Sequence, residues 1–271
     1  MDSKKIKEFQ NQVMDWWCIN ARDLPWRRNP TPYHVLVSEM MLQQTQVTRV
    51  IPKYHEFLEH FPDIKELAKA DAKKLLQVWS GLGYNRRALW LKEAAKHIAE
   101  MREFPSEMEE LRKLKGIGPY TSRSILIFAF NRDLAAVDTN IRRVFIAAGF
   151  ATEEMSKRAI QEVADHLLLK GRSSDWHNAL MDYGSQVLTS SSTGIAPRTT
   201  QSIFVGSTRQ LRGKIVRVLT QSQTISEKEL LRRLELDVSQ QNQFSCVLDQ
   251  LIKEKMVEKI NDDSYRIPSG Y

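Results

Sequence analysis

Cysteine is almost missing from this sequence, because only Cys18 and Cys246 occur among 271 residues. Two thiols exclude a disulfide framework. They also exclude any site that needs three or four thiolates, such as structural zinc or an iron–sulfur cluster. Each cysteine lies within an apolar pattern of helical spacing. We therefore expect two buried, inert thiols.

Long apolar runs are also missing. No stretch approaches the ~18 uninterrupted apolar residues of a membrane-spanning helix. The N-terminal MDSKKIKEFQ is charged and lacks the apolar core of a secretory signal. Glycine and proline are sparse, at 11 and 9 residues, so no low-complexity class fits. These absences predict a cytoplasmic protein without a signal peptide or membrane contact, associated with the nucleoid if it binds DNA.

Acidic residues are absent from one long stretch. The whole sequence contains 40 Lys and Arg and 33 Asp and Glu, which gives a formal net charge of +7. Such a charge permits a polyanionic partner without requiring one. Between residues 189 and 220 there is no Asp or Glu, and the basic residues there are Arg198, Arg209, Arg212, Lys214 and Arg217. The first half, TSSSTGIAPRTTQS, has the composition of a loop. This shift in composition marks a domain boundary.

Helical spacing of apolar residues dominates the chain, and strand-like runs appear only near the C-terminus. Thr31 followed by Pro32 is typical of a helix start, and so is Asp71 before the apolar pattern of 72–79. The sequence predicts an all-α domain over residues 1–188, a basic loop or linker over 189–208, and a module of three helices and a small hairpin over 209–271. That module resembles a winged helix, a unit that binds DNA in some proteins and serves packing or dimerisation in others.

The segment LKGIGPYT (114–121) separates two predicted helices. Gly116 and Gly118 let the backbone turn tightly, and the helix that starts at Pro119 exposes its first amide donors. Such a turn can bind a phosphate through its N–H groups and the positive end of the helix dipole. A plain helix–helix turn without a ligand is the alternative.

Two acidic residues have informative surroundings. Asp138 directly precedes a predicted helix in AAVDTNIRRV (135–144), where Asp commonly serves as a cap. Glu39 lies in VSEMMLQQTQV (37–47) among apolar side chains, at the edge of a buried face. A surface glutamate is the default interpretation, whereas burial at this position would raise its pKa.

Five motifs occur in a recognisable order: LPWR (24–27), SEMMLQQTQV (38–47), WSGLGY (79–84), LKGIGPYT (114–121) and VDTNIRRV (137–144). Over residues 5–187 the sequence closely resembles the adenine DNA glycosylases of the MutY type, in the helix-hairpin-helix superfamily. LQQTQ with GLGY is the specific part of this resemblance, since many repair proteins share the hairpin. FVGSTRQLRGKI (204–215) resembles a segment that follows the catalytic domain in some members. The resemblance implies a two-lobed, all-α glycosylase fold.

The implied activity is monofunctional base excision: hydrolysis of the N-glycosidic bond of adenine mispaired with guanine or 8-oxoguanine. Such cleavage needs one protonated and one ionised acid at the same pH. By the family pattern, Glu39 matches the general acid that serves adenine N7 and then orients water, and Asp138 matches the carboxylate that faces the developing cation. Tyr120 and Asn140 match residues that position these groups. Tyr120 stands where bifunctional relatives carry a Schiff-base lysine, so monofunctional hydrolysis is expected, although a nearby amine such as Lys115 could supply weak, incidental lyase activity.

The resemblance also implies contacts with double-stranded DNA that contains a mispair or oxidised guanine, bound by a monomer. The target base must leave the helix to be reached. The residues that match the wedge filling the gap and touching the opposite base are Gln43, Gln44 and Tyr84, with Thr45 beside them. The positions expected in the adenine pocket are Trp26, Arg27 and Asn178. The expected phosphate contacts are Lys115, Gly116, Gly118 and Arg198.

Three departures from the family pattern matter. First, Leu188 stands at the first of the four cysteines that usually hold an iron–sulfur cluster, so we expect no cofactor and leave open only a monovalent cation at the hairpin. We expect Arg198 and its basic neighbours to take over part of the phosphate binding. Second, the small module replaces a larger domain that inspects 8-oxoguanine, so recognition of the opposite base depends on the wedge residues. Third, Thr139 replaces a more usual glycine and Asn178 a longer polar side chain, and both could retune base choice.

Two alternatives stay open. A mismatch thymine/uracil glycosylase of the same fold shares the Gly-x-Gly-x-Tyr hairpin and both acids, whereas LQQTQ favours adenine. A non-catalytic DNA-binding protein with a degenerate glycosylase domain would bind DNA without releasing a base. The presence of Glu39 and Asp138 at matching positions argues against it.

Overall fold

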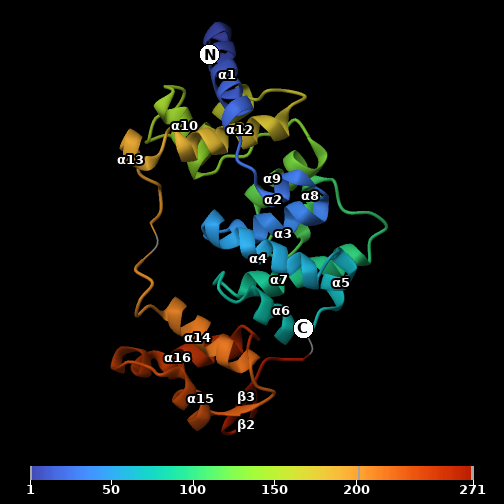
Figure 1. Cartoon of the computed structure of the whole chain (residues 1–271), viewed down its shortest axis with the longest axis vertical. Coiled ribbons are helices and arrows are strands. Elements are labelled where there is room, and N and C mark those ends of the chain that lie inside the picture. Colours follow the sequence, from blue (N-terminus) through green and yellow to red (C-terminus); the bar gives the residue numbers. More distant parts are fainter. Residues whose placement is uncertain (1, 201, 270–271) are drawn as a thin grey trace. The chain divides into compact units, whose positions relative to one another are not determined.

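The computed structural model describes residues 2–200 and 202–269, and Figure 1 shows a mostly helical chain. It folds into two compact units, each assembled from separate stretches of sequence. The first unit comprises Met1–Glu39, Pro105–Lys113 and Ile117–Thr200, and the second comprises Met40–Phe104, Leu114–Gly116 and Gln201–Tyr271. The all-α class expected from the sequence is confirmed. The division expected at residues 188 and 208 stays a prediction.

The first unit is built from helices that lie before residue 40 and between residues 105 and 200. Its elements are α1 (Ser3–Asn20), α2 (Pro25–Arg28), most of α3 (Pro32–Leu42), α8 (Met108–Lys113), α9 (Pro119–Phe130), α10 (Thr139–Ala147), α11 (Lys157–His166), α12 (Ser173–Gln186) and the short α13 (Ser190–Thr193). The second unit contains α4 (Val47–His60), α5 (Ile64–Lys69), α6 (Ala72–Trp79), α7 (Arg86–Ala99), and the C-terminal elements from α14 onward.

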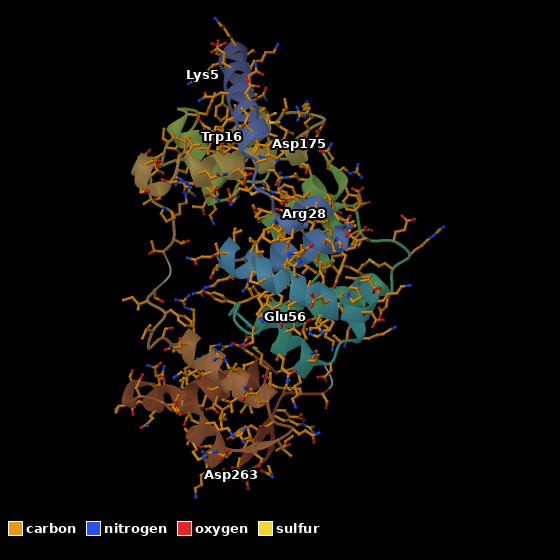
Figure 2. All side chains as sticks on the ribbon, in the orientation of Figure 1. Lys5, Trp16, Arg28, Glu56, Asp175 and Asp263 are labelled. Carbon is orange, nitrogen blue, oxygen red and sulfur yellow. The ribbon has the colours of Figure 1, made fainter. Side chains whose placement is uncertain are left out.

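Aliphatic and aromatic side chains together form a core in the first unit, where α1 and α10 both pack on α12. Phe9 meets Phe145 and Trp176 edge-on, with ring centroids 6.5 and 5.7 Å apart. Trp16, labelled in Figure 2, meets Tyr183 edge-on at 5.1 Å. Burying a large apolar side chain stabilises the fold by about 1.5–3 kcal/mol. This core therefore fixes α12 against the helix that begins after Asp138.

The helices of the second unit follow their sequence signals closely. The side chain of Asp71 accepts a hydrogen bond from the backbone N–H of Lys74 at 2.9 Å, so α6 begins where the sequence predicted. Trp79 at the end of α6 is fully buried against Phe57 of α4. The first helix of the C-terminal module, α14 (Thr208–Thr220), packs on α6, and Gln77 donates to its last carbonyl at 2.5 Å.

The C-terminal module contains α14, α15 (Glu227–Leu234), α16 (Val238–Lys253) and a small antiparallel sheet. The strands are β1 (Ile225–Ser226), β2 (Glu258–Asn261) and β3 (Ser264–Arg266), in the order β1-β3-β2. The predicted hairpin corresponds to β2 and β3. The two-residue strand β1 is too short to give a sequence signal.

Both cysteines are exposed, so the expectation that they are buried is wrong. On α1 the buried side chains are Phe9, Val13 and Met14, and the packing ends before Cys18 is reached. On α16 the buried face includes Phe244, and Cys246 lies two residues further, on the opposite side of the helix. Among residues 2–200 and 202–269, no helix is both long and apolar enough to span a bilayer.

Candidate active site

Glu39 lies on α3 between fully buried neighbours. Val37 and Met40 have no exposed surface, whereas Glu39 keeps part of its side chain accessible. Enclosure by protein raises the pKa of Glu39 to about 7, the Ser124 hydroxyl lowers it, and the charge of Asp138 raises it again. A carboxyl with such a pKa is protonated in a large fraction of molecules at neutral pH. It can therefore act as a general acid.

Asp138 caps α10, as the sequence predicted. Its side chain accepts hydrogen bonds from the backbone N–H of Ile141 at 2.7 Å and from the side-chain amide of Asn140 at 2.9 Å. Burial raises the pKa of Asp138, and these two donors together with the charge of Arg143 oppose that rise. The donors and the positive helix end stabilise the ionised carboxylate in its recessed position.

Tyr120 and Ser124 occupy successive turns of α9. Burial, followed by the charges of Glu39 and Asp138, raises the pKa of Tyr120 well above its usual value, so this phenol stays neutral. The buried Ser124 hydroxyl has no well-aligned hydrogen-bond partner within the described chain. It nevertheless lies close enough to Glu39 and Tyr120 to lower the pKa of each.

The two carboxyls therefore ionise in a fixed order. The charge of Asp138 raises the pKa of Glu39, which means that Glu39 holds its proton while Asp138 is ionised. Both side chains are partly accessible, although protein encloses them enough for burial to dominate their pKa values. One acid and one base thus lie near each other in the first unit, and Asn140 and Tyr120 interact with them.

Arg143 connects this pair of carboxyls to the end of α12. One guanidinium nitrogen donates to the side-chain oxygen of Asn140 at 2.7 Å and to the carbonyl of Gly184 at 2.6 Å. Nε donates to the carbonyl of Leu188 at 2.5 Å. A Cβ on Gly184 would lie 2.9 Å from Asn140, so only glycine allows α12 this close to α10. No pattern in the sequence predicted these contacts of Arg143 or the close packing at Gly184.

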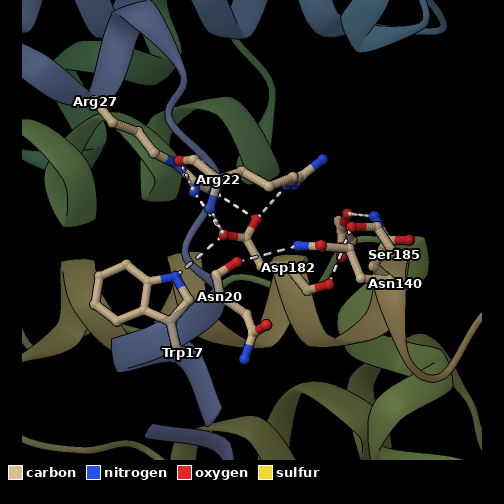
Figure 3. A network of polar contacts seen from close by, with 9 residues as sticks. Trp17, Asn20, Arg22, Arg27, Asn140, Asp182 and Ser185 are labelled. Atoms are coloured by element: carbon tan, nitrogen blue, oxygen red, sulfur yellow. Dashed lines mark hydrogen bonds and ion pairs between the residues drawn. The ribbon is translucent and has the colours of Figure 1, made fainter. Parts of the chain in front are cut away.

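A second polar network, drawn in Figure 3, centres on Asp182 of α12. This fully buried carboxylate pairs with Arg22 at 2.5 Å and Arg27 at 2.7 Å, and it accepts from Trp17 at 3.1 Å. Burial alone would raise the pKa of Asp182, but Arg27 and then Arg22 bring it below its usual range. Trp26 is buried beside Arg27 in α2, while Asn178 is half-buried one turn before Asp182. Asp182 therefore holds this network together, while the place of Asn178 in the base pocket stays a prediction.

The turn after α3 is held by a buried arginine of the second unit. The guanidinium of Arg87 donates to the carbonyl of Gln43 at 2.6 Å and to the hydroxyl of Thr45 at 3.0 Å. Burial lowers the pKa of Arg87 to about 10. Gln44 adopts a left-handed conformation (φ 56°). The predicted wedge residues Gln43 and Gln44, with Thr45 beside them, therefore lie on a turn that Arg87 holds in place.

Tyr84 also lies on a strained turn, with φ at 46° and 39 % of its surface exposed. The guanidinium of Arg209 donates to the Tyr84 hydroxyl at 2.9 Å and lies 5.8 Å from the centre of its ring. The same group lies 6.0 Å from the ring of Phe204. Sequence reasoning missed this contact because Tyr84 and Arg209 are 125 residues apart along the chain, more than any local pattern spans.

The glycine-rich turn between α8 and α9 has the predicted form. Gly116 has a positive φ of 78°, and a Cβ there would lie 3.0 Å from Met40 and from Trp90. Gly118 is the N-cap of α9, with Pro119 in the first turn. Lys115 is exposed between these glycines and the end of α8. The turn therefore offers the free N–H groups of a helix start beside a cation.

The loop after α12 is organised by hydroxyls and arginines. Thr189 caps α13 by accepting from Ser192 at 3.1 Å, and Arg142 donates to the carbonyl of Ala196 at 3.3 Å. Arg198, a predicted phosphate contact, donates to the carbonyl of Met155. No group of three or more His, Cys, Asp or Glu side chains suited to a metal lies within residues 2–200 and 202–269. The donors at this loop are hydroxyls and guanidiniums, which do not fit an iron–sulfur cluster.

Comparisons with known proteins give one family. Residues 37–168 match the model of the HhH-GPD superfamily base excision DNA repair protein. The chain is 35 % identical to the adenine DNA glycosylase of Mycolicibacterium smegmatis over 94 % of both proteins. It is 32 % identical to the human adenine DNA glycosylase, over 69 % of this chain and 37 % of that protein.

Solved structures give the same fold. A thermostable thymine-DNA glycosylase is 27 % identical, with a TM-score of 0.65 over 69 % of this chain and 88 % of that one. A non-covalent endonuclease III–DNA complex is 18 % identical, with a TM-score of 0.62 over 73 % of this chain and 91 % of that one. The second likeness concerns the fold alone.

Proposed function

The chain belongs to the adenine DNA glycosylases of the HhH-GPD superfamily of base excision DNA repair proteins, and from this premise we propose that it releases adenine from mispaired duplex DNA. The observation that carries the proposal is the pair of interacting carboxyls, Glu39 with a pKa near 7 and Asp138 as a helix cap held by hydrogen bonds. Adenine opposite guanine or 8-oxoguanine is the proposed target.

The proposed reaction uses both carboxyls in sequence. Glu39 donates its proton to adenine N7 while the bond between C1′ and N9 breaks, and the bonding electrons leave with the purine. The Asp138 carboxylate stabilises the positive charge that develops on the sugar. Water then attacks C1′ and gives a proton to the Glu39 carboxylate, which restores the acid. The products are free adenine and an abasic site.

Tyr120 and Asn140 position these groups in the proposal. The neutral phenol of Tyr120 can donate a hydrogen bond but cannot form a Schiff base, which supports hydrolysis without a Schiff-base intermediate. Asn140 holds Asp138 at 2.9 Å and is itself held by Arg143 at 2.7 Å. We propose that Trp26 and Arg27 border the base pocket, with Asp182 fixing the guanidinium.

The proposed DNA contacts use the two fixed turns and the hairpin. Gln43, Gln44 and Tyr84 would fill the space left by the extruded base, because their backbones are already held in turn conformations. The N–H groups around Gly116 and Gly118 would bind a phosphate. We propose that the protein acts without an iron–sulfur cluster, since the hydroxyl and arginine contacts after α12 already hold that loop.

A panel of duplexes tests the proposal directly. Single-turnover assays would compare adenine, thymine and uracil as the target, each opposite guanine, and adenine opposite 8-oxoguanine, with alkali to cleave abasic sites. We expect release of free adenine and strand cleavage only after alkali. Release of thymine but not adenine would favour the mismatch thymine glycosylase, which the 27 % identical structure keeps as the second candidate. Binding without release of any base would favour a non-catalytic DNA-binding protein.

A further inference from the structure

The second compact unit contains a pocket of about 480 Å³ at which three distant segments of the chain meet. Helix α7 forms one wall, the glycine-rich turn contributes a second, and the end of α16 with the turn after it contributes a third. The cationic side chains that line this pocket are Arg86, Lys92, Lys96, Lys115, Lys253 and Lys255. The C-terminal module thus supplies two lysines to a site that it shares with the hairpin.

The charge in this pocket is strongly unbalanced. Two carboxylates, Glu93 and Glu254, face the six cations, which leaves a formal excess of +4 in a chain whose net charge is +7. Glu254 is already engaged, because it pairs with Arg212 and lies 4.0 Å from Arg86. Its charge therefore holds the module to α7 rather than neutralising the lysines.

Burial makes this concentration of like charge costly. Lys92 is only 4 % exposed, and burial followed by the nearby charge of Lys96 lowers its pKa, although Asp71 opposes the shift. An anion bound among these lysines would relieve the repulsion between them. Compact ammonium groups act as point charges, which suits the tetrahedral oxygens of a phosphate.

Trp90 lines the pocket where α7 meets the glycine-rich turn. The guanidinium of Arg86 lies 5.4 Å from the centre of the Trp90 ring, and the backbone of Gly116 lies directly against Trp90. The side chain of Lys115 therefore extends from the glycine-rich turn into the pocket's lining. Because Lys115 directly precedes Gly116, a phosphate bound at the turn would lie near the Lys115 end of this cluster.

We propose that the pocket binds a backbone phosphate of DNA, and that Lys253 and Lys255 make the C-terminal module part of the DNA-binding surface. This inference rests on the proposed function, because it assumes that the hairpin contacts DNA. It assigns the module a binding role in place of a purely structural one. Both lysines are exposed, so replacing them leaves the core of the module intact.

The test measures the salt dependence of DNA binding by the full chain. Fluorescence anisotropy would follow an undamaged labelled duplex, which avoids turnover, at several KCl concentrations. Each lost phosphate contact reduces the slope of log K against log salt by about 0.9. We expect the double variant Lys253→Gln/Lys255→Gln to bind several-fold more weakly, with a slope smaller by about 0.9, the value of one phosphate contact.

A matched control comes from the same module. Lys228 and Lys259 are exposed and lie outside the pocket, so Lys228→Gln/Lys259→Gln makes the same change in net charge. This control should keep the wild-type slope. An unchanged slope in the pocket variant, or an equal fall in both double variants, would overturn the proposal.

Two further measurements distinguish a free anion from a DNA phosphate, and failure of the phosphate site from failure of the proposed glycosylase activity. Tripolyphosphate should compete with the duplex for the wild type and compete less well for the pocket variant. Calorimetric binding of tripolyphosphate with no change in the DNA slope would assign the pocket to a free anion and overturn the DNA assignment. If the wild type releases no base and the pocket variant still shows a smaller salt slope, the proposed glycosylase activity is refuted and the phosphate site is supported.

Discussion

Replacing Ser124 with alanine should move the alkaline limb of the excision rate to higher pH. The Ser124 hydroxyl lowers the pKa of Glu39, which burial has raised to about 7. Removing the hydroxyl leaves burial and the charge of Asp138 in place, so Glu39 should keep its proton further into the alkaline range. Because this hydroxyl has no well-aligned partner in the described chain, its loss should disturb the fold little.

The size of the effect follows from the fraction of protonated Glu39. With a pKa of about 7, the wild-type rate should fall about tenfold for each pH unit above 7. Each unit by which Ser124→Ala raises that pKa should increase the rate near pH 9 by about tenfold, with little change near pH 6. The acidic limb, set by ionisation of Asp138, should move much less.

Single-turnover excision of adenine between pH 5 and 9.5 would measure both limbs, with enzyme in excess over a labelled duplex. Thr121→Ser, a buried change of one methyl group in the same helix, serves as a packing control and should leave the alkaline limb in place. An alkaline limb that Ser124→Ala leaves unmoved, or moves to lower pH, would refute the assignment of that limb to Glu39.

Three other perturbations test the framework around the site. His177 is buried, and burial lowers its pKa to about 4, so only the neutral imidazole fits the folded state. Relative to His177→Gln, the wild type should lose about 3 kcal/mol of unfolding free energy in urea as pH falls from about 6.5 to 4. Gly184→Ala would place a Cβ 2.9 Å from Asn140 and should lower the unfolding free energy by about 1–3 kcal/mol and slow excision; unaltered urea and rate data would contradict this packing. Asp182→Asn would leave two arginines without their counter-charge and should lower the unfolding free energy by about 3 kcal/mol. This is near the lower end for a buried pair because both arginines keep some solvent contact, and an unchanged urea midpoint would argue against the network.

Local signals account for how well the helices could be predicted. Asp71 and Asp138 each combine a cap residue with the apolar spacing that follows, and both caps form in the structure. The apolar neighbours of Glu39 likewise indicated a partly enclosed carboxyl, and its raised pKa agrees with that. These features depend on residues within about two turns of each other, which is the range over which a sequence pattern carries information.

Contacts between distant segments explain what could not be predicted. Arg143 reaches the backbone carbonyl of Leu188, and a backbone group leaves no trace in the sequence. The contact between Arg209 and Tyr84 depends on how α14 packs against α6. The expected burial of Cys18 failed because apolar spacing does not show where a helix leaves the core.

The proposed chemistry depends most directly on the two carboxyls, and one set of rates tests them. Single-turnover release of adenine opposite 8-oxoguanine would be compared for wild type, Glu39→Gln and Asp138→Asn, with duplex affinity measured in parallel. We predict that each variant binds DNA normally and is slower by about 10²–10⁴-fold. A variant that releases adenine at the wild-type rate would contradict the role given to its carboxyl, and with it the proposed chemistry.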